Sequence, residues 1–246
     1  MTRRPAETVV ASSIVEQAET QARHLRVRDG MIVGLTLLTG ATDAMAFTRL
    51  GGVFTSVMTG NMVLIGVAIG RGTYTTLAHT ALAIVAYIAG SLAGGRAVGS
   101  PRDDDGPWPP AMSAALVVEI ALFAAFAGLW WTNLHHLSGT DQSVLLVLSA
   151  TALGLQSATI LRLGISGLST TYLTGTLTTV MHGLASRRSL QGNGRSLLIL
   201  AALIVGAAIG ALAARFVPAI AATIPLVIAI AVVLVARFVL AAQPTS

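Results

Sequence analysis

The sequence contains no cysteine and no lysine, and only 10% of its 246 residues are charged. The absence of cysteine excludes disulfide bonds, thiol catalysis and thiolate metal sites. A soluble domain usually carries about 25% charged residues, whereas 54% of the residues here are hydrophobic. A soluble chain of this kind would expose too much apolar surface to stay dispersed. Its long apolar runs therefore predict an all-α polytopic membrane protein.

All 15 basic residues are arginines, and the net charge is +5. They lie at the ends of apolar runs and in the N-terminal region rather than along one face of a fold. Arginines in such positions are typical of residues that set the orientation of a membrane protein and contact lipid headgroups. We therefore expect the lipid bilayer as a partner and do not expect nucleic acid.

Residues 1–30 are polar and arginine-rich, and no apolar region of the signal-peptide kind follows them. We interpret them as a basic cytoplasmic tail that is disordered. The alternative is a short amphipathic helix lying on the cytoplasmic face, because apolar residues recur at helical spacing. These are Val9, Val10, Ile14, Val15, Ala18 and Ala22.

The rest of the chain shows an internal repeat. Residues 31–132 form the first predicted membrane repeat, 133–142 a loop, and 143–241 the second repeat. Each repeat contains an apolar span, a broken segment and two further spans. The repeat distance of about 115 residues is too long for a solenoid and is typical of a duplicated transporter half.

The two broken segments, residues 51–70 and 166–183, are apolar but interrupted by glycine and by hydroxyl and amide side chains. Thr59-Gly60-Asn61 in the first matches Thr174-Gly175-Thr176 in the second, and Thr55 matches Thr170. Each reads as an extended piece followed by a helix start, which directs free N–H groups towards a polar or anionic solute. Alternatively, these residues only allow close helix packing.

Arginine positions discriminate between two topologies. If each broken segment dips into the membrane and returns, there are six full spans, and 12 of the 15 arginines lie on the inside. If both segments cross, there are eight spans and 10 arginines inside. The positive-inside rule favours six spans. Three spans per half is an odd number, so the two halves would be inverted relative to each other.

Two acidic residues lie within predicted spans. Asp43 is about 18 Å along its helix from Met31 and hence near the middle of the bilayer. It is either a group that couples transport to protons or cations, a substrate contact, or a structural partner of the broken segment. We expect it to lie close to Thr59-Gly60-Asn61. Gln156 occupies the matching position when both are counted from Arg49 and Arg162.

Glu119 lies about two turns into its span. It could form an ion pair with Arg96, take part in coupling, or extend towards the membrane interface.

The candidate substrate- or ion-binding residues come from both repeats, namely Asp43, Thr55, Thr59, Gly60, Asn61, Gln156, Thr170, Thr174, Gly175 and Thr176. The sequence has no nucleophile–base pair and no phosphate-binding loop, and its histidines lack a second ligand at metal-binding spacing. We therefore expect no enzyme activity, no catalytic residue, no metal and no cofactor.

Several motifs resemble the YoaK-type family of uncharacterised bacterial inner-membrane proteins. They are Thr39-Gly40-Ala41-Thr42-Asp43-Ala44, Gly52-Val53-Phe54-Thr55, Met58-Thr59-Gly60-Asn61, Gly154-Leu155-Gln156-Ser157-Ala158 and Thr170-Thr171-Tyr172-Leu173-Thr174-Gly175-Thr176-Leu177. The resemblance implies a multi-span protein of the bacterial cytoplasmic (inner) membrane. In the family, Asn follows Gly-Leu-Gln, whereas this chain has Ser157.

We therefore expect a small secondary transporter or permease for a small polar or anionic solute, with its N-terminus in the cytoplasm. The alternative is a non-transporting membrane scaffold or sensor. A polar midplane cavity lined by Asp43, Asn61, Gln156 and Thr176 would favour transport. A dry interior, with these side chains satisfied by one another, would favour the alternative.

Overall fold

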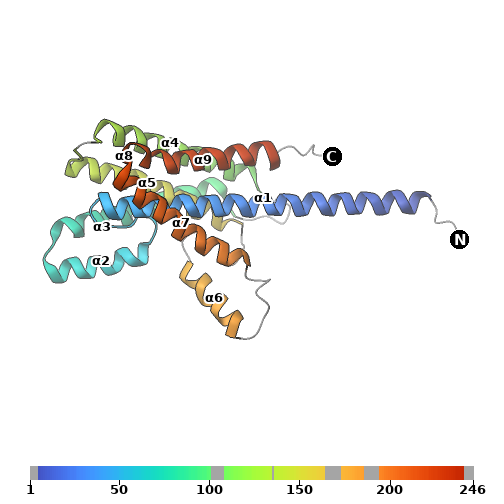
Figure 1. Cartoon of the computed structure of the whole chain (residues 1–246), viewed down its shortest axis with the longest axis horizontal. Helices are drawn as coiled ribbons and strands as arrows, with labels where there is room; N and C mark the ends of the chain where they lie inside the picture. Colours follow the sequence, from blue (N-terminus) through green and yellow to red (C-terminus); the bar gives the residue numbers. More distant parts are fainter. Residues whose placement is uncertain (1–4, 101–107, 135, 164–172, 186–193, 241–246) are drawn as a thin grey trace.

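The computed structural model describes residues 5–100, 108–134, 136–163, 173–185 and 194–240. Within these residues the chain is helical apart from short connections, and it contains no strand (Figure 1). The helices are α1 (Pro5–Arg49), α2 (Met58–Arg71), α3 (Tyr74–Val98), α4 (Pro110–Thr132), α5 (Gly139–Leu161), α6 (Leu173–Ala185), α7 (Gly194–Phe216), α8 (Pro218–Ala221) and α9 (Thr223–Val235), and a π-helical turn (Ala236–Leu240) follows.

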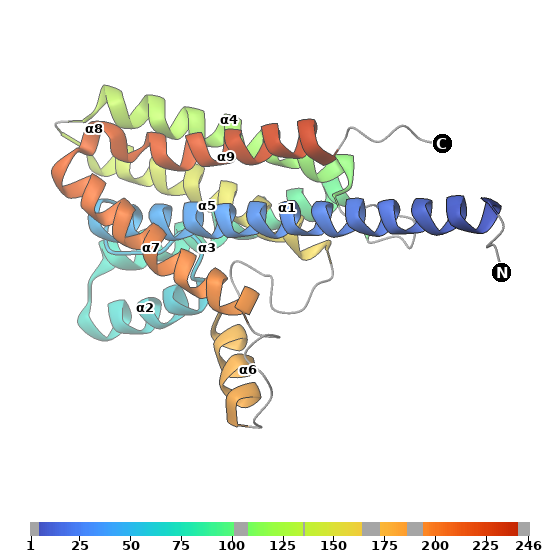
Figure 2. The same ribbon diagram turned by 45° about the vertical axis from the view of Figure 1, so that its right-hand side comes forward.

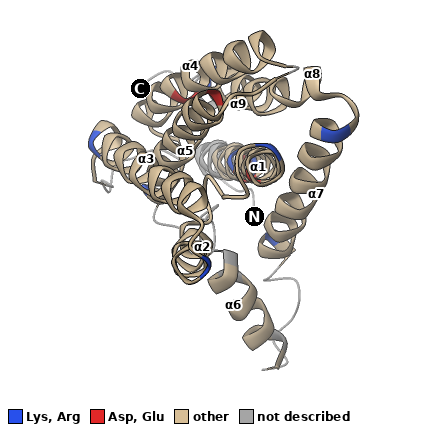
Figure 3. Cartoon of the chain, turned by 90° about the vertical axis from the view of Figure 1, so that its left-hand side faces the viewer, with Lys and Arg blue, Asp and Glu red and all other residues tan. Residues whose placement is uncertain are grey.

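Six of the described helical stretches are long and apolar enough to cross a membrane. By contrast, α2 has 14 residues and α6 has 13, which is about 20 Å of helix against a hydrocarbon core of about 30 Å. Large apolar side chains are exposed on the outer helices, for example Val85, Ile204 and Val227, and Figure 3 shows how few residues of the bundle are charged. The chain is an all-α polytopic membrane protein in contact with lipid.

The N-terminal region is helical from Pro5 and is continuous with the first span. At 45 residues, α1 is about 68 Å long, and its first half projects beyond the bundle (Figures 1 and 2). The expectation of a disordered tail is therefore wrong for residues 5–30. The helix also continues the axis of the first span, so it is not a separate helix lying across the membrane surface.

Glycines bring two pairs of helices into backbone contact. On α7, Gly206 lies against the carbonyl group of Leu37 in α1, and on α3, Gly90 lies against the carbonyl group of Thr151 in α5. A Cβ atom at either glycine would collide with that carbonyl oxygen. Gly94 is similar, because its Cβ would lie 2.7 Å from the carbonyl oxygen of Leu155. These glycines are required for close packing of α1 on α7 and of α3 on α5.

The same contact recurs in the two halves of the chain. Gly40 lies against Leu203 and Ala207, and Gly154 lies against Tyr87 and Ser91. The α1 and α5 positions differ by 114 residues (154 − 40), and the α3 and α7 positions differ by 116 (203 − 87). The division into residues 31–132 and 143–241 stays a prediction, and this recurrence supports it.

The recurring contacts correct one correspondence made from the sequence. Adding 114 to positions of α1 pairs Asp43 with Ser157, and Thr42 with Gln156. Counting from Arg49 and Arg162 had paired Asp43 with Gln156. Packing sets the register at the glycines, whereas the terminal arginine of a span is free to shift by a residue.

Helix directions show that the first broken segment returns to the end of the bundle where it began. The glycine contacts make α1 parallel to α7 and α3 parallel to α5. The guanidinium of Arg49 lies 5.8 Å from the ring centroid of Trp130, so the ends of α1 and α4 meet, and α5 starts there. Consequently α1 is antiparallel to both α3 and α5 (Figure 1). Eight crossings would instead make α1 and α3 parallel.

Candidate functional site

The carboxylate of Asp43 binds the non-helical segment between α1 and α2. Its Oδ1 atom accepts hydrogen bonds from the backbone N–H of Thr55 at 2.7 Å, the hydroxyl of Thr55 at 2.9 Å and the backbone N–H of Ser56 at 2.9 Å. Its Oδ2 atom accepts a further one from the hydroxyl of Ser56. All three residues are buried. Both carboxylate oxygens are therefore used by groups twelve and thirteen residues away in the chain.

Asn61 binds the same segment from α2. Its amide oxygen accepts a hydrogen bond from the backbone N–H of Phe54 at 3.0 Å, and its amide nitrogen donates to the carbonyl oxygen of Phe54 at 2.7 Å. The Asn61 side chain is fully buried. Non-helical backbone within a membrane is tolerated only where its polar groups find partners in the protein. Asp43 and Asn61 supply those partners from the two flanking helices.

The sequence around the segment explains its path. Gly51 and Gly52 have φ values of 95° and 74°, a region that favours glycine, and they turn the chain sharply after α1. Phe54 then stacks on Phe47 of α1, with ring centroids 4.9 Å apart. At the start of α2, Val57 provides no side-chain cap, so the first N–H groups of this helix are not capped by a side chain.

Gln156 of α5 adds to the group of buried polar side chains around Asp43, which we call the polar centre. Its amide nitrogen donates to the hydroxyl of Thr39 at 2.9 Å, and Thr39 lies one turn before Asp43 on α1. The amide oxygen of Gln156 has no hydrogen-bond partner among the described residues, although the side chain is fully buried. Thr39 was not among the predicted site residues, yet its spacing from Asp43 (i, i+4) is a signal that could have identified it.

The structure does not place every predicted site residue at this centre. Thr59, on the first turn of α2, and Thr174 and Gly175, on α6, are exposed, while Gly60 is half-buried. Thr170 and the side chain of Thr176 lie outside the part of the chain that is described. Ser56 contributes two hydrogen bonds to Asp43 and was missed as a site residue, although the Thr55-Ser56 pair lies within the broken segment.

Glu119 differs from all of these residues. It is fully buried in α4, and neither of its carboxylate oxygens has a hydrogen-bond partner among the described residues. Arg96 is exposed and donates to the carbonyl oxygen of Leu92 at 3.4 Å. The expected Glu119–Arg96 ion pair is therefore wrong, and complete burial also rules out extension towards the interface.

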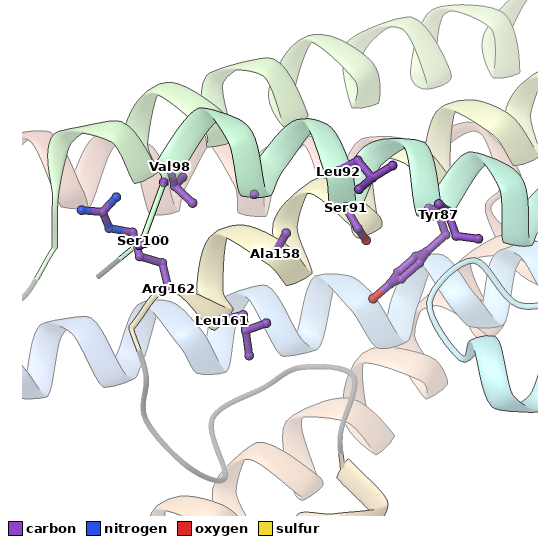
Figure 4. A pocket seen from close by; sticks show the side chains of 11 residues that line it. Tyr87, Ser91, Leu92, Val98, Ser100, Ala158, Leu161 and Arg162 are labelled. Atoms are coloured by element: carbon purple, nitrogen blue, oxygen red, sulfur yellow. The ribbon is translucent and has the colours of Figure 1, made fainter. Parts of the chain in front are cut away.

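A groove of about 580 Å³ lies between α3 and α5 (Figure 4). Its lining is mostly apolar and includes Tyr87, Leu92, Ala158, Leu161 and Arg162. None of the predicted site residues lines it, and no group of metal-ligating side chains occurs in the described part of the chain. The polar centre around Asp43 is thus the better candidate site.

Comparison with known proteins identifies the family. Residues 31–236 match the family described as "Protein of unknown function (DUF1275)". The chain belongs to this family. It is also 32% identical, over 160 residues, to the UPF0700 transmembrane protein YoaK of Bacillus subtilis (strain 168), covering 65% of this chain and 68% of that protein. No solved structure matches significantly. The resemblance read from the sequence motifs is confirmed.

Proposed function

We propose that this member of the family is a small secondary transporter or permease for a small polar or anionic solute. The observation that carries the proposal is the first broken segment, whose non-helical backbone is held inside the bundle by Asp43 and Asn61. Segments of this kind mark the binding sites of transporters built from inverted repeats. The proposal includes no catalytic step, metal or cofactor.

The chain enters its two broken segments from opposite ends of the bundle. The first lies between the end of α1 and the start of α3, near Trp130. The described part of the second, α6, follows α5 and precedes α7, and α7 begins at the end of the bundle where Arg195 binds Asp29 of α1 at 3.1 Å. This arrangement supports two inverted halves. The positive-inside rule then supports a cytoplasmic location for the Asp29 end, and hence for the N-terminus, in the bacterial cytoplasmic (inner) membrane.

The start of α2 supports the proposed solute class. Its first turn has no side-chain cap, and Thr59 is exposed beside it. Uncapped N–H groups and the positive end of a helix dipole favour a polar or negatively charged group.

The alternative is a non-transporting scaffold or sensor, and one observation favours it. Asp43 and Asn61 are satisfied by the neighbouring backbone rather than directed into an open cavity. In addition, α1 projects from the bundle, where it could meet another protein. A transporter with a closed central site would show the same hydrogen-bonded side chains, so a ligand-binding experiment must distinguish the two functions.

A solute-stabilisation screen tests the proposal, since a ligand that binds only the folded protein raises its apparent stability. The purified protein would be melted with a panel of small anions and polar solutes, and each hit tested for counterflow in proteoliposomes. At Gly60 an added Cβ would lie 3.3 Å from Val57 and 3.4 Å from Phe54, whereas at Gly66 nothing lies within 4 Å. Gly60→Leu should abolish the solute effect, and the control Gly66→Leu should retain it. A panel with no hit and no counterflow would contradict transport.

A further inference from the structure

Glu119 is a buried acid in apolar surroundings. Its α4 neighbours Leu116 and Phe123, one turn away on either side, belong to the largest apolar core cluster, together with Leu153 of α5 and Val232 of α9. Figure 1 shows α4 lying along α9, with α5 beside it. Nothing in the part of the chain that is described donates a hydrogen bond to either carboxylate oxygen.

No charged group on the helices packed against α4 compensates Glu119. The described helix α9 has no titratable residue, and on α5 the only acid, Asp141, forms a capping box with Ser138 at the first turn. The titratable residues of α3 are Tyr74, His79, Tyr87 and Arg96, and none is hydrogen-bonded to Glu119. Asp43 on α1 is occupied by Thr55 and Ser56.

A carboxylate without partners in such a place is strongly disfavoured, and the group becomes neutral by binding a proton instead. A metal ion would not serve, because hard cations require several oxygen ligands and no cluster of such ligands occurs in the described chain. The carboxylate of Glu119 is therefore suited to bind a proton rather than a metal ion.

A second observation places further unsatisfied oxygens on the adjacent helix. Gln156 Oε1 and Ser157 Oγ, both on α5, are buried without a partner among the described residues. Because α4 packs directly on α5, an opening of the bundle that admits water to Glu119 would also bring water to these polar atoms of α5.

We propose that Glu119 is the proton-binding group of the carrier, an inference that rests on the proposed transport function. In the state described here Glu119 holds its proton. When α4 and α5 separate and water enters, the O–H bond breaks, the proton passes to water as hydronium, and the carboxylate remains. The reverse step reloads the proton before the helices close. Asp43 takes no part in this exchange.

Infrared spectroscopy of the purified protein tests whether Glu119 holds a proton, without any solute. Glu119→Gln keeps the size of the side chain but cannot ionise, so the carbonyl stretching band of a protonated carboxyl group at neutral pH should be lost. Asp43→Asn, the matched control, should retain that band. A Glu119→Gln protein that keeps the band, or a wild-type protein that lacks it, overturns the proposal. If Glu119→Gln does not fold, Glu119→Met provides the same subtraction.

Proteoliposomes test the coupling, using a solute identified by the stabilisation screen. Glu119→Gln should lose accumulation driven by a pH gradient, while solute counterflow stays within about twofold of wild type. Full pH-driven accumulation by Glu119→Gln overturns the coupling role alone. If the wild-type protein moves no solute at all, the transport function and the coupling role both fail, whereas the infrared band still shows whether Glu119 holds a proton.

Discussion

Asp43 and Glu119 are both buried in membrane spans, yet their surroundings are opposite. Asp43 accepts four hydrogen bonds from Thr55 and Ser56, whereas Glu119 accepts none from the described residues. Four donors suit a carboxylate anion, because an ionised carboxylate can only accept hydrogen bonds. Apolar surroundings without hydrogen-bond donors suit the protonated, neutral acid. Burial alone therefore does not assign a role to an intramembrane acid, and the number of donors around it is more informative.

Replacing each acid by leucine should produce the largest difference. Asp43→Leu leaves the backbone N–H groups of Thr55 and Ser56 unpaired, at a cost of about 2–6 kcal/mol of unfolding free energy. Glu119→Leu removes a polar group from an apolar site and should leave stability unchanged or raised. Thermal unfolding of both variants in the same detergent measures this. Similar melting temperatures for the two would contradict the assigned roles.

A second test asks whether Asp43 acts alone on the broken segment. Asn61→Leu leaves both backbone groups of Phe54 unpaired and should lower the free energy of unfolding by about 2–4 kcal/mol. Because Asn61 and Asp43 bind adjacent residues, the double variant should lose less than the sum of the two single losses. Additive losses would show that Asp43 and Asn61 stabilise the broken segment independently of each other. Asn61→Leu combined with Glu119→Leu is the control pair and should be additive.

The amide variants should differ by a smaller amount. Asp43→Asn weakens charge-assisted hydrogen bonds and should cost about 1–2 kcal/mol. Glu119→Gln replaces one neutral group by another of the same size and should change stability by less than about 1 kcal/mol. Chemical denaturation resolves such a difference. A greater loss for Glu119→Gln than for Asp43→Asn would mean that Glu119 has a partner that matters to the fold.

A third carboxylate, Asp29, gives the smallest expected effect. It is paired with Arg28 and Arg195 at the Asp29 end of the bundle, and its side chain is 27% exposed. Partly exposed ion pairs contribute about 0.2–1 kcal/mol, so Arg195→Gln should lower the melting temperature only slightly, and less so at high salt. A loss of stability as large as that of Asp43→Leu would mean that the Asp29–Arg195 ion pair is as important to the fold as the hydrogen bonds of Asp43.

Hydropathy was sufficient to predict the membrane class and the six long helices, because each span must bury enough apolar residues to cross the bilayer. The Gly-rich interruption also predicted the first broken segment correctly. The partners of Asp43 were not predictable in the same way. Thr59-Gly60-Asn61 was expected beside it, whereas Thr55 and Ser56 occupy that place, since two left-handed glycines direct the segment back along α1.

Other features depend on packing that no local pattern reveals. The glycine contacts between helices pair Asp43 with Ser157. Counting residues from the terminal arginines had paired Asp43 with Gln156, one position earlier. The isolation of Glu119 depends on which faces of α5 and α9 it meets. A helix in the N-terminal region was only the alternative prediction, because its polar, charged composition resembles that of a disordered segment, although about half of its residues are good helix formers.

Thiol labelling tests the central claim, namely that the first broken segment enters the bundle and returns to the same side. The native chain has no cysteine, so Thr48→Cys and Arg71→Cys each introduce a single thiol, at exposed positions before and after the segment. A membrane-impermeant maleimide added to intact cells should label both positions, with Gly194→Cys labelled only after permeabilisation. Labelling of position 48 but not of position 71 from outside would mean that the segment crosses the membrane, and would contradict the account.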